Sequence, residues 1–235
     1  MTVIMLLDDM AGGSNAPIEA AVDVSRLFDA EIYCLDDIAS MYGTPIARAL
    51  RGEAPASGPS DRCEICFERS AGTCAPLLRQ ATFIVTSARD KLIRLVRQGY
   101  GSVLLIPDGQ ARFRLAGRAV IGVDGSPSIF DNVETVAPLL AAATAIDVVT
   151  LGRATAAEGG RMLSLLRSHA IPHGTQVELT QSTLDDIDLG RRCRRVRTDW
   201  CLIGATGQNG RCPSPALTSL LDLSLIHIWR CRRRG

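Results

Sequence analysis

The chain has few of the residues on which common catalytic sites depend, and it has no apolar segment of the length that a membrane-spanning helix requires. It contains three histidines and a single lysine, Lys91, among 235 residues. Its longest apolar stretches are far too short to span a bilayer; they are Val3–Leu7, Val103–Pro107 and Val136–Ala145. The first residues lack a basic region and a cleavage-type ending, so no signal peptide is expected. We therefore predict a cytoplasmic protein that is not bound to a membrane.

The scarcity of lysine excludes two kinds of phosphate chemistry. A Walker A loop needs a lysine after its glycines. The pair Asp8-Asp9 after the first apolar run resembles a phosphoacceptor site, but such a site also needs a lysine at the end of the fifth strand, and Lys91 is the only one. No Ser/His/Asp or paired-carboxylate arrangement can be assembled either. No catalytic residue is predicted, which leaves weak ATP hydrolysis as an open alternative.

The eight cysteines are scattered along the chain, and disulfides are not expected in a reducing compartment. Cys63-Glu-Ile-Cys66 has zinc-ligand spacing, and His169 and His173 could complete a set of four ligands. The CEIC segment, however, lies within an apparent strand, about 100 residues from the histidines. Without a second local pair of ligands, no metal site is predicted.

The last thirteen positions, Leu223–Gly235, differ in character from the rest of the chain. They resemble, residue for residue, the translation of a common sequencing-library transposon adapter with its stop codon decoded as Trp229. We therefore predict a non-native tail. Without its four arginines the chain has 22 Lys and Arg against 25 Asp and Glu, so the small basic surplus disappears. The alternative is a genuine basic tail that binds an acidic partner. Leu223–Ile228 has enough β-branched and apolar character to occupy a strand position.

An internal repeat organises the remaining sequence. The strand-like Val3–Asp8 and Val120–Asp124 both end in an acid, 116 residues apart. At the same offset the helical pattern of Pro17–Phe28 falls on Val133–Thr144, and Ile32–Leu35 falls on 148–151. A further pair, 82–85 and 199–202, matches at an offset of 117. We interpret this order as a tandem duplication.

Each copy alternates short apolar strands with helical patterns, which predicts a mostly parallel sheet with helices on both faces. The predicted fold class is α/β, with two tandem, open, five-stranded Rossmann-like sheets. The predicted domains are 1–108, a linker at 109–117, and 118–222. The predicted strands are 3–7, 31–35, 63–68, 82–86 and 102–107 in the first copy and 119–123, 146–151, 175–179 and 200–203 in the second. We expect the second domain to be truncated before its last strand.

The second copy contains the candidate binding motif. One strand ends in Asp124-Gly-Ser, and a later strand opens into a loop that contains Gly204, Gly207 and Gly210. In an open parallel sheet, ligands bind beyond the carboxyl ends of the strands, where the strand order reverses. Asp124 suits the base or ribose of a nucleotide, and backbone amides near Gly204 and Gly207 suit phosphate. Glycines that merely turn the chain are the alternative interpretation.

At these residues the chain resembles the universal stress protein family, which begins its domain with a strand ending in Asp-Gly-Ser and carries a late G-x2-G-x9-G-[ST] phosphate loop. Gly204 and Gly207 match the first spacing, but Leu217-Thr218 stands where the family has its final pair. In the first copy Thr86–Asp90 replaces the glycine loop, so that copy is expected to bind no nucleotide.

The resemblance implies a stress-response factor that acts by binding, with ATP in the second domain as its cofactor and a homodimer as its assembly. The alternatives are a nucleotide-hydrolysing α/β enzyme and a structural interaction module that binds no nucleotide. The arginine run from 191 to 197 is interpreted as a solvated helix face, with Asp185, Asp186 and Asp188 available for ion pairs. Contact with nucleic acid is the less favoured reading of that run, and no nucleic-acid partner is predicted.

Overall fold

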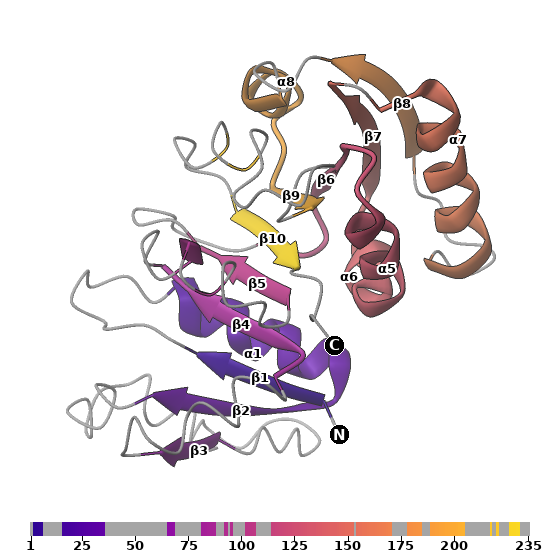
Figure 1. Ribbon diagram of the computed structural model, residues 1–235. Helices are drawn as coiled ribbons and strands as arrows, with labels where there is room; N and C mark the ends of the chain where they lie inside the picture. Colours follow the sequence, from indigo (N-terminus) through magenta and orange to yellow (C-terminus); the bar gives the residue numbers. More distant parts are fainter. Residues whose placement is uncertain are drawn as a thin grey trace.

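The structure is a computed structural model of the full chain, drawn as a ribbon in Figure 1. It describes part of the chain. The described residues are 2–6, 16–35, 65–68, 81–87, 92–93, 95, 102–106, 114–152, 154–170, 178–184, 189–204, 217, 220 and 226–230.

The described strands form one ten-stranded sheet with the order β3-β2-β1-β4-β5-β10-β9-β6-β7-β8. All neighbouring strands are parallel except β10 and β5, which are antiparallel. The strands are β1 (Thr2–Leu6), β2 (Ala30–Leu35), β3 (Ile65–Glu68), β4 (Phe83–Thr86), β5 (Ser102–Leu105), β6 (Arg118–Val123), β7 (Ala145–Leu151), β8 (Glu178–Leu184), β9 (Trp200–Gly204) and β10 (Ile226–Arg230).

The first five strands and the last five have the same order. In both, the first strand of the set lies between the second and the fourth, the third is at the outer edge, and the fifth is at the centre of the ten-stranded sheet. The prediction of two separate sheets is corrected, because β5 pairs with β10 and joins the two sets edge to edge. Figure 1 shows the two sets meeting at this antiparallel pair.

Strand β10 fills the position that the sequence was expected to leave vacant. It lies within Leu223–Gly235, and it pairs with β9 from Ile226↔Trp200 to Arg230↔Gly204. These apolar and β-branched residues therefore form a strand, as their composition favours. The origin of the segment stays a prediction.

Helices cover both faces of the sheet. They are α1 (Ala16–Phe28), α5 (Pro127–Thr135), α6 (Ala137–Ala142), α7 (Ala156–Leu165), which continues into the short η2 (Leu166–Ala170), and α8 (Leu189–Val196). Residues of α1, α5, α6 and α7 share one buried cluster with Ile121 and Val123 of β6. Side chains alternate along a strand, so Gly122 faces the other way, towards Leu189 of α8. None of the described helices is both long and apolar enough to cross a membrane.

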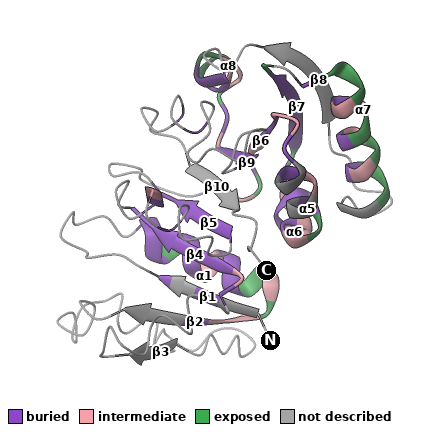
Figure 2. Ribbon diagram, viewed as in Figure 1, coloured by how far each residue is buried: buried purple, intermediate pink, exposed green. Residues whose placement is uncertain are grey.

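The buried cluster under α1 and α6 continues across the β5–β10 junction. It contains Ile4 and Phe83 from the first strand set and Ile121 and Trp200 from the second. The Phe28 ring of α1 packs on Phe83, with centroids 4.8 Å apart and an interplanar angle of 60°. Strands β4 and β5 of the first set and β6 and β9 of the second are buried (Figure 2). The two halves thus share one core on this face, which favours a fixed arrangement between them.

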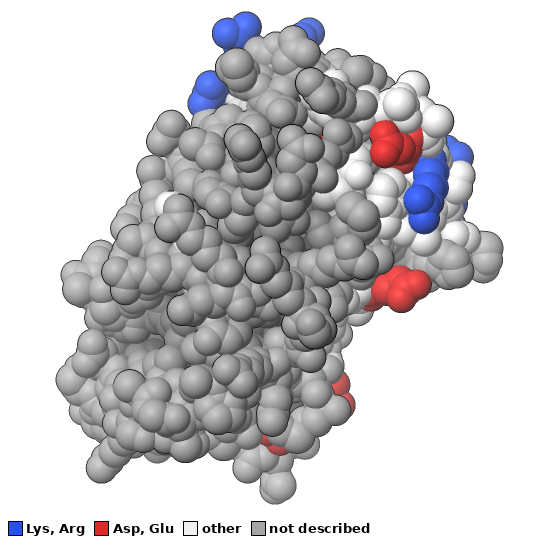
Figure 3. All heavy atoms as spheres, in the orientation of Figure 1, with Lys and Arg blue, Asp and Glu red and all other residues white. Residues whose placement is uncertain are grey.

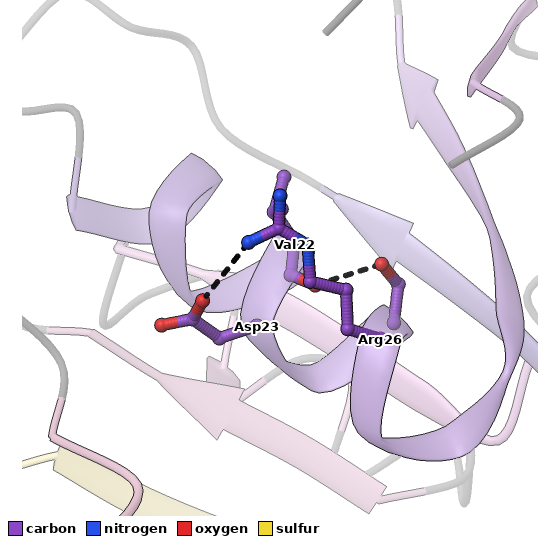
Figure 4. Close-up of polar contacts among 4 residues, drawn as sticks. Val22, Asp23 and Arg26 are labelled. Atoms are coloured by element: carbon purple, nitrogen blue, oxygen red, sulfur yellow. Dashed lines mark hydrogen bonds and ion pairs between the residues drawn. The ribbon is translucent and has the colours of Figure 1, made fainter. Parts of the chain in front are cut away.

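Helix α1 follows the apolar spacing of its sequence. Ile18, Ala21 and Val24 are buried, at three-residue intervals on one helix face. On the solvent side Arg26 lies 3.9 Å from Asp23, while the hydroxyl of the buried Ser25 donates to the Val22 carbonyl at 2.8 Å (Figure 4). A surface ion pair of this kind contributes little, so burial of the apolar face holds the helix.

Two predicted elements differ from the structure. The helix expected at 133–144 is two helices, α5 and α6, separated at Val136. Pro138 explains the break, since it lacks the N–H that a continuous helix would use and instead stands in the first turn of α6. The strand expected at 175–179 is β8, which runs from Glu178 to Leu184. Its Thr, Gln and Ser residues conceal an edge strand from a search for apolar runs.

Helix α8 is bound to the sheet by a buried ion pair. Asp147 of β7 is almost fully buried, and its Oδ2 accepts from Nη2 of Arg192 at 2.6 Å and from Nε at 2.8 Å. The helix ends in a left-handed turn with Arg197 at φ 53°, where Thr198 N donates to Cys193 O and Arg197 N donates to Arg194 O. This short turn leads directly into β9.

Two buried thiols lie beneath α8. Cys193 and Cys201 are free and inaccessible to solvent. A hydrogen bond to Cys201 lowers the pKa of Cys193, while burial raises the pKa of Cys201 well above its usual range. Cys201 is therefore a protonated thiol at neutral pH and packs as a small apolar side chain.

Candidate functional site

The fold brings the carboxyl ends of β6 and β9 together at one edge of the sheet. The two strands are parallel neighbours, and Gly122 is paired with Ile203. Asp124 follows β6 directly, and Gly204 is the buried last residue of β9. The structure thus brings two of the three predicted site residues to the same edge. Gly207 lies outside the described residues.

A tight turn holds the Asp124 carboxylate in place. Ser126 N donates to Oδ1 of Asp124 at 2.9 Å, which closes a side-chain turn of the type that Asp commonly makes. Gly125 between them has φ 78°, a conformation that glycine adopts without steric cost. Ser126 is buried, and α5 begins at the next residue. The Asp-Gly-Ser sequence therefore fixes the acid at the start of a helix.

The second carboxylate oxygen of Asp124 is buried and has no hydrogen-bond partner among the described residues. Burial is the main reason that the pKa of Asp124 is raised, and hydrogen bonds from Ser126 oppose the shift. The carboxylate of Glu158 adds to it by repulsion. A desolvated acceptor of this kind is stabilised by a ligand hydroxyl or amino group that donates to it.

Glu158 belongs to the first turn of α7, and sequence reasoning missed it. Its Oε2 accepts from Thr155 N at 2.7 Å, while Glu158 N donates to Thr155 Oγ1 at 3.3 Å, which completes a capping box. The Thr-x-x-Glu spacing predicts such a box and could have revealed it. Because these groups satisfy each other, the positive end of α7 is already matched by a carboxylate. This end of the site is unfavourable for phosphate.

The departures from the glycine motif have structural counterparts. Leu217, at the position of the family's final glycine, is fully buried. In the first strand set, Thr86 and Ser87 at the end of β4 are also buried, and Asp8 and Asp9 lie outside the described residues. The described parts of the chain contain no group of three or more potential metal ligands. Cys63 and His173 lie outside those parts, as do the side chains of Cys66 and His169.

The Asp124 geometry predicts a pH-dependent gain in stability for Asp124→Asn. A folded-state pKa above the unfolded value means that folding favours the protonated acid, so wild-type stability is lost as pH rises through the folded pKa. The neutral amide removes this loss. At pH 7 we expect the variant to be more stable than the wild type by about 1 kcal/mol, and the gain should shrink as the pH falls towards 3.8. Urea unfolding across this range measures it, and a variant that is less stable at pH 7 would contradict the account.

The comparisons with known proteins identify the fold. No family model matches the chain, and no curated protein matches it. Among solved structures, it is similar to a putative universal stress protein from Pseudomonas aeruginosa UCBPP-PA14, with 16% identity over 98% of this chain and 93% of that one and a TM-score of 0.56. A universal stress protein from Archaeoglobus fulgidus DSM 4304 has 11% identity, 97% and 96% coverage and a TM-score of 0.57.

The same fold also occurs in a different setting. The cytoplasmic domain of a prokaryotic cation chloride cotransporter matches with 13% identity, 98% and 95% coverage and a TM-score of 0.53. At these identities the likeness defines an α/β fold of the kind found in universal stress proteins. Function must be argued from the site itself.

Proposed function

We propose that the protein is a universal stress protein-like factor that acts by binding a nucleotide, ATP, in its second half. The main support for this proposal is the buried Oδ2 of Asp124, which is an acceptor without a partner among the described residues. It lies at the sheet edge where β6 and β9 end, beside Gly204. A base amino group or a ribose hydroxyl would donate to it. The likeness of the fold to universal stress proteins supports a stress-response role.

The charges at the site support one orientation of the ligand. Asp124 and Glu158 both repel phosphate, and the start of α7 is capped by its own Thr155 and Glu158 side chains. The base and ribose therefore belong next to Asp124, and the phosphates belong at Gly204, the end of β9, where the predicted glycine motif with Gly207 begins. Backbone amides of a glycine-containing loop suit phosphate.

We propose further that the chain is a tandem duplication whose first half has lost its nucleotide site. The equal strand order of the two sets supports this, as do the offsets of 116 between the starts of β1 and β6 and 117 between those of β4 and β9. No metal is required by the proposal, and we expect a cytoplasmic, homodimeric protein.

Calorimetric titration with ATP tests the nucleotide proposal. The wild type is expected to release or take up heat with one site per chain. Asp124→Ala is expected to weaken binding by about tenfold or more, the equivalent of one lost charge-assisted hydrogen bond. Gly207→Val is expected to weaken binding as well, because a branched side chain hinders close approach of a phosphate to the backbone. Gly160→Ala is the control, because a Cβ there meets nothing within 4 Å. Equal affinity in all four proteins would place the site elsewhere, and no heat in the wild type would favour a structural module.

We also propose that Leu223–Gly235 is absent from the natural protein, on the strength of its residue-by-residue match to translated adapter DNA. Long-read sequencing of unamplified genomic DNA across the locus tests this. We expect a different sequence after about residue 221, with a helix and an apolar strand at the position of β10. Finding the present codons in the chromosome would overturn the proposal.

A further inference from the structure

Helix α8 presents a solvent face composed of arginine. Arg191, Arg194 and Arg195 are exposed on the helix, and Arg197 is exposed in the turn that follows; these four residues are called the α8 basic face below. The opposite side of the helix is buried, through Leu189, Gly190 and Cys193. Residues three and four apart lie on one side of a helix, so Arg191, Arg194 and Arg195 are adjacent.

The remaining arginine of the run, Arg192, differs from the four residues of the α8 basic face. Arg192 points inwards and forms an ion pair with Asp147. Among the described residues no acid forms an ion pair with Arg194, Arg195 or Arg197. Other surface arginines have partners of their own, Asp23 for Arg26 and the Phe130 ring for Arg161. In Figure 3 blue atoms gather over α8 at the top of the view, while over α7 blue and red atoms lie together.

Backbone geometry adds a second observation. Arg197 has φ 53° in the left-handed region, which costs a side-chain-bearing residue about 1–2 kcal/mol and which glycine adopts freely. Among the described residues the other non-glycine of this kind is Asp29, a type that tolerates the conformation. An arginine at a position suited to glycine adds one more cation to the same face.

The composition of the α8 basic face selects among anionic partners. Protein hot spots combine arginine with aromatic side chains in a buried, well-packed centre, and the only exposed large hydrophobic residue among those described is Leu27, on α1. Membrane-surface helices insert an apolar side, but that side of α8 is packed on the sheet. A phosphate backbone needs only cationic donors, and the guanidinium fork binds phosphate with two hydrogen bonds. Against the expectation from the sequence that no nucleic acid is bound, we propose that the α8 basic face binds the phosphate backbone of a nucleic acid without reading its sequence.

Fluorescence anisotropy with a labelled 30-base-pair DNA duplex, between 50 and 300 mM KCl, tests the proposal. The full chain is compared with Arg194→Gln/Arg195→Gln/Arg197→Gln. The control is Arg114→Gln/Arg161→Gln/Arg167→Gln, which removes the same charge from exposed positions elsewhere. We expect the α8 variant to bind about tenfold or more weakly at 50 mM KCl, and its slope of log K against log[salt] to fall by about 2–3. The control should stay close to the wild type.

Two outcomes would overturn the proposal. One is an equal loss in both triple variants, or in neither, which would assign binding to net charge or to other arginines. The other is a wild type that binds labelled poly-glutamate or anionic vesicles but not the duplex. Circular dichroism and urea unfolding confirm that both variants fold. If the α8 triple variant does not fold, the single variants Arg194→Gln and Arg195→Gln are each expected to reduce the salt slope by about 1.

Discussion

Replacing Arg192 with alanine is expected to lower the free energy of unfolding by about 3–5 kcal/mol. The substitution leaves the Asp147 carboxylate buried, with its side chain 1% exposed, and deprives it of the two guanidinium contacts at 2.6 and 2.8 Å. Breaking a buried pair from one side is costly because the remaining charge stays desolvated. Chemical unfolding measures the loss. Arg194→Ala, at an exposed position of the same helix, should change stability by no more than about 0.5 kcal/mol.

Substitution of the other partner of the ion pair, Asp147, gives a second test. Asp147→Leu should cost less than Arg192→Ala, because the Arg192 side chain is 26% exposed and its charge can turn towards water. The double variant Asp147→Leu/Arg192→Met should lie close to the wild type, since an apolar pair of similar volume often replaces a buried ion pair without loss. Equal, small effects for all variants would show that α8 is held by apolar packing alone.

Gly117→Ala is expected to cost about 1–3 kcal/mol. A Cβ on Gly117 would lie 2.4 Å from Oδ2 and 2.5 Å from Cγ of Asp199, so the carboxylate must move. That carboxylate accepts from Arg118 N at 2.8 Å, and Asp199 N donates to Arg118 O at 2.9 Å. These bonds join the first residue of β6 to the residue before β9, the two strands that form the candidate site.

Gly160→Ala is the matched control for this prediction. Gly160 lies within α7, and a Cβ there would meet nothing within 4 Å. Alanine is favoured over glycine in a helix by about 0.8–1 kcal/mol, so this variant should gain stability of that order. Thermal or urea unfolding compares the two. A loss at Gly160, or none at Gly117, would contradict the packing around the β6–β9 junction.

The strands were predictable wherever burial is complete. The buried strands β6, β7 and β9 lie within a residue of their expected positions, because each is mostly apolar along its length. Polar β8 was misplaced, and the break between α5 and α6 was missed although Pro138 signalled it. The joining of the two strand sets at β5 and β10 depends on pairing between distant segments, which periodicity within one segment does not encode.

The candidate site could be predicted in part. The Asp-Gly-Ser turn and Gly204 follow from the position of residues at strand ends. The burial of one Asp124 oxygen, and the repulsion from Glu158, could not be predicted, because α7 reaches this edge only through the packing of the whole second half. The same limit applies to the arginines at 191–197. Their spacing predicts a helix, but only the structure separates inward Arg192 from the exposed four.

A crystal structure of the full chain grown with a non-hydrolysable ATP analogue distinguishes nucleotide binding from a structural module. We expect one analogue per chain at the edge formed by β6 and β9. Its base or ribose should donate to Oδ2 of Asp124, and its phosphates should lie at the loop that begins with Gly204. An analogue bound in the first half, or phosphates placed against Glu158 at the start of α7, would contradict it.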